Sequence, residues 1–192
     1  MRTALVVDDE PMIRRQVAET LLRYGFDEIV EAGNGKEAVD LAAVRKPLLI
    51  VMDVSMPVLD GITAADKIGK KAPTPIVLLT GTADAETIER ARLAGVMSYV
   101  VKPFREAQVY AAVDLAIHQF VEVSSLREEV ASLKETLETR KLIEKAKGII
   151  MKERGLDEDA AYALLRTRAM QRGARLVVVA EMVNEAAEVM QL

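Results

Sequence analysis

Short apolar runs rich in β-branched residues alternate with longer amphipathic stretches over the first 118 residues. This pattern predicts five strands, near residues 3–8, 28–32, 48–53, 75–79 and 98–101. It predicts a helix after each strand, near residues 11–24, 35–45, 61–71, 84–94 and 105–118. Strict alternation of strand and helix is typical of βαβ units with parallel strands. We therefore expect residues 1–118 to form an α/β domain with a flavodoxin-like, doubly wound, five-stranded parallel sheet.

The hydrophobic pattern then changes to a long helical one. Between residues 105 and 154 the only glycine is Gly148 and proline is absent, so the fifth helix can continue without a break. Within residues 119–139, apolar residues recur at 4-3-4 spacing among Glu and Lys, at Leu126, Val130, Leu133 and Leu137. This spacing predicts a coiled-coil linker helix that forms a homodimer. The alternative is an amphipathic helix that packs on its own domain.

Residues 140–192 are predicted to form three helices, near 140–154, 157–171 and 176–190. Gly155 and Gly173 separate them, and Asp157 is a suitable N-cap. A three-helix unit of this size buries little apolar surface, so we expect it to depend on the coiled coil or on a partner chain.

Composition restricts the function classes. The 192 residues include no cysteine, which excludes disulfides and thiolate metal sites. No apolar run reaches the roughly 18 residues of a membrane span, and the acidic Asp8-Asp9 comes too early for a signal peptide. We expect a cytoplasmic protein without a membrane partner. Residues 140–192 carry 10 Lys or Arg against 8 Asp or Glu, whereas the rest of the chain is acidic, so a polyanionic partner is expected at the C-terminal part.

Chemically useful side chains stand at the ends of four predicted strands. Asp8 and Asp9 follow the first, Asp53 ends the third, and Thr80 and Lys102 follow the fourth and fifth. Taken singly, Asp8-Asp9 is explained by a turn with a helix N-cap, Thr80 by a strand-end cap and Lys102 by a solvated surface position. The carboxyl ends of parallel strands, however, share one edge of a sheet, so we expect one pocket there. Carboxylates without His or Cys favour Mg²⁺, and a carboxylate beside Mg²⁺ and a lysine can attack a phosphoryl donor.

The helix predicted at 140–154 carries a basic stripe. A helical projection places Lys141, Lys145, Gly148 and Lys152 within roughly 60° of one another. A glycine inside a helix costs about 1 kcal/mol relative to alanine, and a bare backbone between ammonium groups lets a nucleic-acid phosphate approach closely. The alternative is a solvated face with close helix packing at Gly148.

Four arginines add positive charge further on, at Arg166, Arg168, Arg172 and Arg175. Tyr162 is the only aromatic residue in this part and lies in a run that is typical of core. We therefore expect nucleic-acid contacts to depend on phosphates and folded shape more than on stacking.

The segments Val6–Pro11, Met52–Gly61, Leu79–Gly81 and Val101–Phe104 resemble the signature segments of two-component receiver domains. The resemblance covers residues 1 to about 118. It implies that Asp53 accepts phosphate from a sensor histidine kinase. It also implies that Asp8, Asp9 and the Ser55 carbonyl complete a Mg²⁺ site with Asp53.

The same resemblance assigns roles to other residues. Thr80 and Tyr99 correspond to the switch pair of the family. Lys102 corresponds to the lysine that pairs with phosphate and precedes a cis peptide bond to Pro103. Ser55 and Thr82 occupy positions that tune dephosphorylation.

Residues 138–190 resemble the ANTAR output domain through Arg140–Met151, Asp159–Tyr162 and Leu164–Arg166. This resemblance implies dimers that grip paired RNA hairpins in nascent transcripts and prevent terminator formation. We expect RNA contacts from Lys141, Lys145, Lys147, Gly148, Lys152, Arg172 and Arg175. Gly173 departs from the pattern, because many members have a polar or basic residue there.

The sequence therefore predicts a phosphorylation-dependent antiterminator, dimeric when phosphorylated, that is not an enzyme acting on an external substrate. It divides into residues 1–118, 119–139 and 140–192. One alternative is a DNA-binding response regulator that uses its C-terminal helices as a helix-turn-helix. A phosphohydrolase with Asp53 as nucleophile is disfavoured, because the sequence shows neither a capping element nor a second acid/base aspartate beside Asp53.

Overall fold

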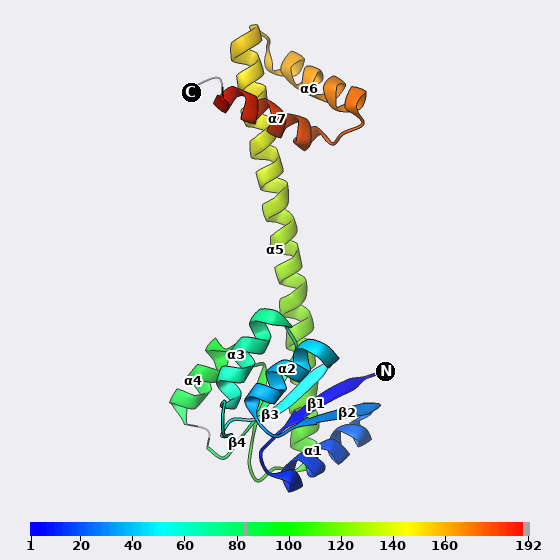
Figure 1. The fold of residues 1–192 in the computed structure, drawn as a ribbon, viewed down its shortest axis with the longest axis vertical. Coiled ribbons are helices and arrows are strands. Elements are labelled where there is room, and N and C mark those ends of the chain that lie inside the picture. Colours follow the sequence, from blue (N-terminus) through cyan, green and yellow to red (C-terminus); the bar gives the residue numbers. More distant parts are fainter. Residues whose placement is uncertain (83, 190–192) are drawn as a thin grey trace. The chain divides into compact units, whose positions relative to one another are not determined.

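The computed structural model describes residues 1–82 and 84–189 (Figure 1). The chain forms two compact units, one of residues 1–124 and the other from residue 125 onward. The first unit is an α/β domain. Its strands are β1 (Thr3–Val7), β2 (Glu28–Ala32), β3 (Leu49–Asp53), β4 (Ile76–Thr80) and β5 (Ser98–Val101). Its helices are α1 (Pro11–Tyr24), α2 (Gly35–Arg45), α3 (Gly61–Lys71), α4 (Ala85–Leu93) and the first turns of α5 (Glu106–Arg154).

The five strands form one parallel sheet in the order β2-β1-β3-β4-β5. The strand order reverses direction at β1, as a doubly wound sheet requires. The predicted flavodoxin-like fold is therefore confirmed, and the bounds of β1–β5 and α1–α4 lie within one or two residues of those expected.

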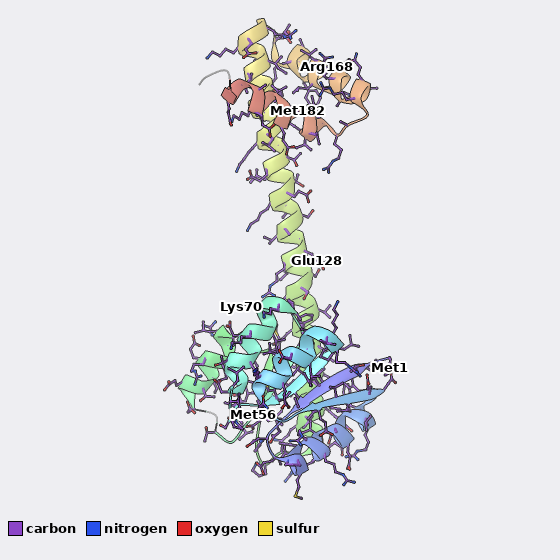
Figure 2. The ribbon with its side chains drawn as sticks, viewed as in Figure 1. Met1, Met56, Lys70, Glu128, Arg168 and Met182 are labelled. Atoms are coloured by element: carbon purple, nitrogen blue, oxygen red, sulfur yellow. The ribbon has the colours of Figure 1, made fainter. Side chains whose placement is uncertain are left out.

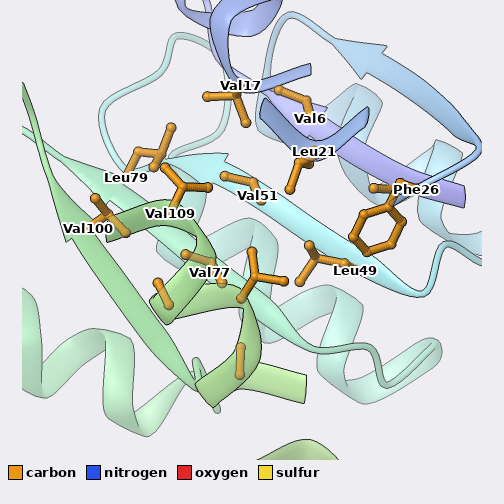
Figure 3. Close-up of a cluster of buried hydrophobic side chains, with 14 residues drawn as sticks. Val6, Val17, Leu21, Phe26, Leu49, Val51, Val77, Leu79, Val100 and Val109 are labelled. Carbon is orange, nitrogen blue, oxygen red and sulfur yellow. The ribbon is translucent and has the colours of Figure 1, made fainter. Parts of the chain in front are cut away.

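Helices cover both faces of the sheet, which explains why its strands are almost continuously apolar. Successive side chains of a strand point to opposite faces. Val6 and Val51 face a cluster with Val17 of α1 and Val109 of α5, shown in Figure 3. The residues beside them in the strands face a second cluster built with α2, α3 and α4.

The second unit contains the rest of α5, then α6 (Glu158–Arg172) and α7 (Leu176–Val189). The continuous fifth helix that the sequence predicts is confirmed, because α5 runs unbroken from Glu106 to Arg154 and its last part is the first of the three expected helical segments. Small side chains dominate the core of this unit, which includes Ala146, Ala161, Ala169 and Ala180. Figure 2 shows Arg168 on α6 and Met182 on α7, both of which are exposed.

Gly173, the departure from the ANTAR pattern, has a backbone role. It ends α6 in the left-handed conformation, with φ of 59°, and its N–H donates to the carbonyl of Met170. Glycine adopts this conformation without a steric penalty, so the residue provides a clean helix end.

The predicted coiled-coil seam lies on the exposed surface of α5. Leu126, Val130, Leu133 and Leu137 are between 49% and 62% exposed. The long helix fits the predicted coiled coil, and the exposure of the seam argues against its packing within the chain. Among the helices that the structure describes, none combines the length and the apolar character needed to cross a membrane.

Candidate functional site

The expected residues meet at the carboxyl edge of the sheet. Asp53 ends β3 and lies opposite Leu79 of β4, while Thr80 lies opposite Val101 of β5. Val7, which precedes Asp8, lies opposite Met52, which precedes Asp53. The four strands β1, β3, β4 and β5 are adjacent in the sheet, so their ends supply one shared site.

Lys102 joins the two buried carboxylates of this site. Its Nζ lies 2.7 Å from Oδ2 of Asp8 and 2.6 Å from Oδ1 of Asp53. Asp8 is completely buried and Asp53 nearly so. The peptide bond from Lys102 to Pro103 is cis, as the receiver resemblance implies. The geometry thus brings three of the predicted residues into direct contact.

Burial governs the charges of this cluster. It raises the pKa of Asp53, and the neighbouring charge of Asp8 raises it further, against the opposing effect of Lys102. Burial by itself lowers the pKa of Lys102, but hydrogen bonds and charges from Asp53 and Asp8 outweigh it and raise that pKa overall. The single ammonium of Lys102 thus pairs with the carboxylates of both Asp8 and Asp53, and ionisation of both leaves a net negative charge in the site.

Backbone groups orient both carboxylates. The Ser55 N–H donates to Oδ2 of Asp53 over 2.7 Å, and the Glu10 N–H donates to Oδ1 of Asp8 over 2.9 Å. Arg14 holds the loop that follows β1, because its Nη1 donates to the Asp8 carbonyl over 2.7 Å. Each carboxylate therefore has one oxygen on Lys102 and the other on a loop N–H.

Gly61, the first residue of α3, brings the loop after β3 close to Asp53. Its N–H donates to the Val54 carbonyl over 2.9 Å. A Cβ at this position would lie 2.0 Å from the backbone oxygen of Asp53. No side chain fits in that space, so glycine is required for this approach of the loop.

Within the described residues, no three Asp, Glu, His or Cys side chains are grouped as a metal site, and Asp9 lies exposed beside the buried pair. The donors present nevertheless suit Mg²⁺. This ion takes oxygen ligands, keeps several waters, and needs only one or two carboxylates together with a phosphate. Asp8 and Asp53 supply two buried carboxylates with uncompensated negative charge, so a divalent cation would be stabilised here.

The two residues of the predicted switch pair line one small hollow beside α4, but their side chains have different surroundings. The buried hydroxyl of Thr80 donates to the Thr82 carbonyl and accepts from the Thr82 N–H over 3.2 Å, so it is engaged by the loop after β4. The ring of Tyr99 is 45% exposed. Thr80 therefore makes its hydrogen bonds with Thr82, and the tyrosine extends toward solvent.

The whole predicted basic stripe is exposed in the second unit. Lys141, Lys145, Gly148 and Lys152 all lie at the surface of α5. A Cβ added to Gly148 would meet no atom of the described chain within 4 Å. The alternative of close packing against another helix of the same chain is therefore wrong for the part of the chain that the structure covers.

Two lysines of the stripe already hold carboxylates. Lys141 pairs with Glu138 over 2.8 Å, and Lys145 of α5 pairs with Glu188 of α7 over 2.7 Å. The hydrogen bond from Lys145 lowers the pKa of Glu188. Sequence reasoning missed Glu188, because no local pattern shows which carboxylate of α7 comes to lie beside α5.

Lys147 does not lie on the exposed surface where an RNA contact was expected. Its side chain is 8% exposed, and its Nζ lies 3.0 Å from Glu144 and 2.5 Å from Glu158 of α6. The helical phase explains this position, since Lys147 follows the buried Ala146 and is outside the stripe. It joins α5 to the start of α6.

The two remaining predicted RNA contacts, Arg172 and Arg175, are exposed. Nη1 of Arg172 lies 3.2 Å from Sδ of Met182.

Tyr162 was expected in the core, but it is 43% exposed on α6, so that expectation is wrong. Asn184, a buried residue missed from the sequence, donates from Nδ2 to the Leu142 carbonyl over 3.0 Å.

Comparison with known proteins agrees with both parts of this geometry. Residues 4–114 match the response regulator receiver domain, and residues 131–183 match the ANTAR domain. The chain belongs to the ANTAR-containing response regulators. This family membership indicates a transcriptional regulator.

Relatives of this response regulator support the assignment over up to 96% of the chain. The transcriptional regulatory protein PdtaR of Mycobacterium tuberculosis is 45% identical over 184 residues, which cover 96% of this chain and 90% of that protein. The chemotaxis protein CheY of Bacillus subtilis is 32% identical over 115 residues, or 59% of this chain and 96% of CheY. The high-resolution structure of the chemotaxis response regulator CheY4 of Vibrio cholerae matches with a TM-score of 0.56 and 29% identity, over 60% of this chain and 98% of that one.

Proposed function

We propose that phosphorylation of Asp53 switches this response regulator, which then binds RNA hairpins in nascent transcripts and prevents transcription termination. The observation that carries the proposal is the occurrence in one chain of a buried, lysine-bridged aspartate and an exposed lysine stripe around an unpacked glycine. The expected place of action is the cytoplasm, where transcripts are made.

A sensor histidine kinase is the proposed phosphoryl donor. A carboxylate oxygen of Asp53 attacks phosphorus, the P–N bond to the kinase histidine breaks, and an acyl phosphate forms on Asp53. Asp8, Asp9, Asp53 and the Ser55 carbonyl would hold Mg²⁺, which neutralises charge on the phosphoryl oxygens. Lys102 then moves its ammonium from the Asp53 carboxylate to a phosphoryl oxygen. Its present distance of 2.6 Å from Asp53 supports this role.

Phosphorylation would change the partners of Thr80. A phosphoryl oxygen is a stronger acceptor than the Thr82 carbonyl, because hydrogen bonds to charged groups are stronger than neutral ones. Transfer of the Thr80 hydroxyl from Thr82 to the phosphate would free the loop after β4. The exposed ring of Tyr99 could then turn inward and change the surface beside α5.

The apolar seam on α5 is the proposed dimer contact. Leu126, Val130, Leu133 and Leu137 present their side chains at the spacing that pairs two helices. We propose that phosphorylation favours this pairing and thereby brings two ANTAR units together. Two units can then engage two hairpins of one transcript, with the gain in apparent affinity that linked sites provide.

Within each unit, RNA contact is proposed along the stripe of Lys141, Lys145, Gly148 and Lys152. The lysines neutralise phosphates, and the uncovered backbone at Gly148 lets the RNA strand approach α5 closely. Arg172 and Arg175 are proposed to extend this contact. Lys147 is left out of the RNA surface because its side chain is only 8% exposed, whereas those of Lys141 and Lys145 are more than half exposed.

A gel-shift experiment with an RNA hairpin pair tests the proposal. It compares wild type with Asp53→Ala, each with and without beryllofluoride as a phosphoryl mimic. Mimic-dependent binding that is absent in Asp53→Ala supports the switched antiterminator. Binding to duplex DNA in preference to hairpins would favour a DNA-binding regulator, and absence of RNA binding in every state would contradict the proposal.

A further inference from the structure

A groove lies at the amino edge of the sheet, at the opposite strand ends from Asp53. Arg2, Leu48 and Pro75 line it, and they immediately precede β1, β3 and β4. Those strands are five residues long, so roughly 17 Å separates this edge from the carboxyl edge. The groove encloses about 640 Å³, within the range typical of small-molecule sites. It is therefore separate from the phosphorylation site.

The walls of the groove are mainly apolar. Phe26 and Leu48 form one part, and Ile117, Phe120 and Val121 of α5 form another. Leu48 and Val121 are both more than half exposed. Covering these apolar side chains with a ligand removes apolar surface from water, which favours binding.

The groove is held open by stiff loops. Pro47, Pro73 and Pro75 all line it, and these are three of the six prolines in the chain. Because proline fixes φ, the segments before β3 and β4 lose little further conformational freedom when a ligand binds. A site formed in advance binds small ligands more tightly than one that must be ordered.

The charge around the groove has one sign. Arg2, Lys46 and Lys71 line it, and none of its described lining residues is acidic. Among the described residues, Lys46 and Lys71 form no ion pair. The guanidinium of Arg2 is fixed 4.9 Å above the Phe26 ring, and its Nη1 donates to the Gly25 carbonyl. Two uncommitted ammonium groups thus stand beside an apolar hollow.

We propose that this groove is a binding site for a small amphiphile that has one anionic head and an aromatic or acyl body. The head would pair with Lys46 and Lys71, and the body would cover Leu48, Phe120 and Val121. The volume, the apolar walls and the uniform positive charge all fit this class of ligand. Since three residues of α5 line the groove, the ligand binds against the helix that continues into the coiled-coil segment.

Two probes that differ only in the anionic group test the proposal on the full chain. 8-Anilino-1-naphthalenesulfonate carries a sulfonate, and N-phenyl-1-naphthylamine is the same ring system without it. Fluorescence titration is expected to show one strong site for the sulfonate and weaker binding of the neutral probe. The double variant Lys46→Gln/Lys71→Gln should weaken sulfonate binding roughly tenfold and leave the neutral probe unchanged.

Control variants separate this site from general surface binding. Lys67→Gln removes an exposed lysine of α3 that does not line the groove, so both affinities should stay as in wild type. Leu48→Ser shortens an apolar wall and should weaken both probes. All these positions are exposed, and urea unfolding verifies that each variant is folded.

Amide chemical shifts locate the bound sulfonate probe. The proposal expects changes in residues 46–48, 71–75 and 117–121. A second apolar hollow, lined by Ile149, Leu164 and Val183, lies within the ANTAR unit and is the competing location. Shifts confined to that hollow, absence of binding, or sulfonate affinity that is unchanged in the double lysine variant would each overturn the proposal.

Discussion

The ammonium of Lys102 lies 2.6 Å from Oδ1 of Asp53, and the same ammonium is shared with Asp8. Removing one partner of a buried ion pair leaves an uncompensated charge, which commonly costs about 3–5 kcal/mol. Here the loss of Lys102 would leave two buried carboxylates facing each other.

Lys102→Met is therefore expected to lower the free energy of unfolding at pH 7 by about 3 kcal/mol. Part of this loss should return in Lys102→Met/Asp53→Asn, which removes one of the repelling charges. Urea unfolding measures both. Lys70→Met breaks an exposed pair with Asp66 and should change stability by no more than about 0.5 kcal/mol. Equal effects at positions 70 and 102 would contradict the importance of the buried cluster.

Asp53→Asn is expected to make the protein more stable than wild type at pH 7. Burial raises the pKa of Asp53 in the folded protein, so the fold binds this proton more tightly than the unfolded chain does. The protonated Asp53 therefore contributes to the free energy of unfolding. This contribution is fully present below the pKa that Asp53 has in the unfolded chain, and it is lost as pH rises through the pKa that Asp53 has in the folded protein. Asparagine does not titrate, so the advantage of the variant should be small near pH 3.5 and grow toward pH 7. An advantage that is independent of pH would argue against a raised pKa.

Gly61→Ala should destabilise the receiver domain by about 2–3 kcal/mol, because its Cβ would lie 2.0 Å from the Asp53 backbone oxygen. Gly69→Ala in the same helix is the matched control. The nearest atom to a Cβ there is 3.9 Å away, so alanine should stabilise α3 by about 0.5–1 kcal/mol. Thermal unfolding of the two variants should give shifts of opposite sign.

Gly148→Ala separates stability from RNA binding. The new methyl group meets no described atom within 4 Å, and alanine is the better helix former, so the ANTAR unit should gain about 1 kcal/mol. The same methyl group should keep RNA away from the backbone and weaken hairpin binding in a gel shift. Ser125→Ala, at an exposed position of the same helix, should leave binding unchanged. Unchanged binding in Gly148→Ala would remove Gly148 from the proposed RNA surface.

Lys145 and Lys147 should respond differently to the same substitution. Lys145→Gln is expected to weaken hairpin binding and to reduce the slope of log affinity against log salt by about 0.7–0.9. Lys147→Gln should instead lower the stability of the ANTAR unit, because its buried side chain joins α5 to Glu158 of α6. Its salt slope should match wild type under conditions where it is folded. A reduced slope for Lys147→Gln would restore it as an RNA contact.

The receiver half was predictable from sequence because its chemistry sits at strand ends. An apolar run that stops at Asp53 or before Lys102 fixes both the element and the position of the side chain, and the parallel topology brings the ends together. The link between Lys102 and two carboxylates could be anticipated as a cluster. The sequence could not show that each carboxylate accepts one hydrogen bond from Lys102 and another from a loop N–H, because loop geometry has no periodic pattern.

The C-terminal helices were harder to predict, since a helix pattern gives a phase but not the partner of each face. Tyr162 lies beside core residues in sequence, yet it is exposed on α6. Lys147 lies in a basic segment, yet it is buried by a carboxylate from α6. The amino-edge groove had no sequence signature either, because its walls come from five separated segments.

The ion pairs on the lysine stripe have a consequence for selectivity. A phosphate that contacts Lys141 or Lys145 competes with Glu138 or Glu188 for the same ammonium group. Contact with any polyanion therefore replaces the Lys141–Glu138 and Lys145–Glu188 ion pairs with pairs to phosphate. This exchange depends on charge, which is the same for every transcript. On the proposed function, an RNA whose shape fits the open helix face at Gly148 would gain an advantage that charge alone does not give. On the proposed RNA-binding function, the two glutamates would weaken non-specific contact with polyanions by the small free energy of two exposed ion pairs.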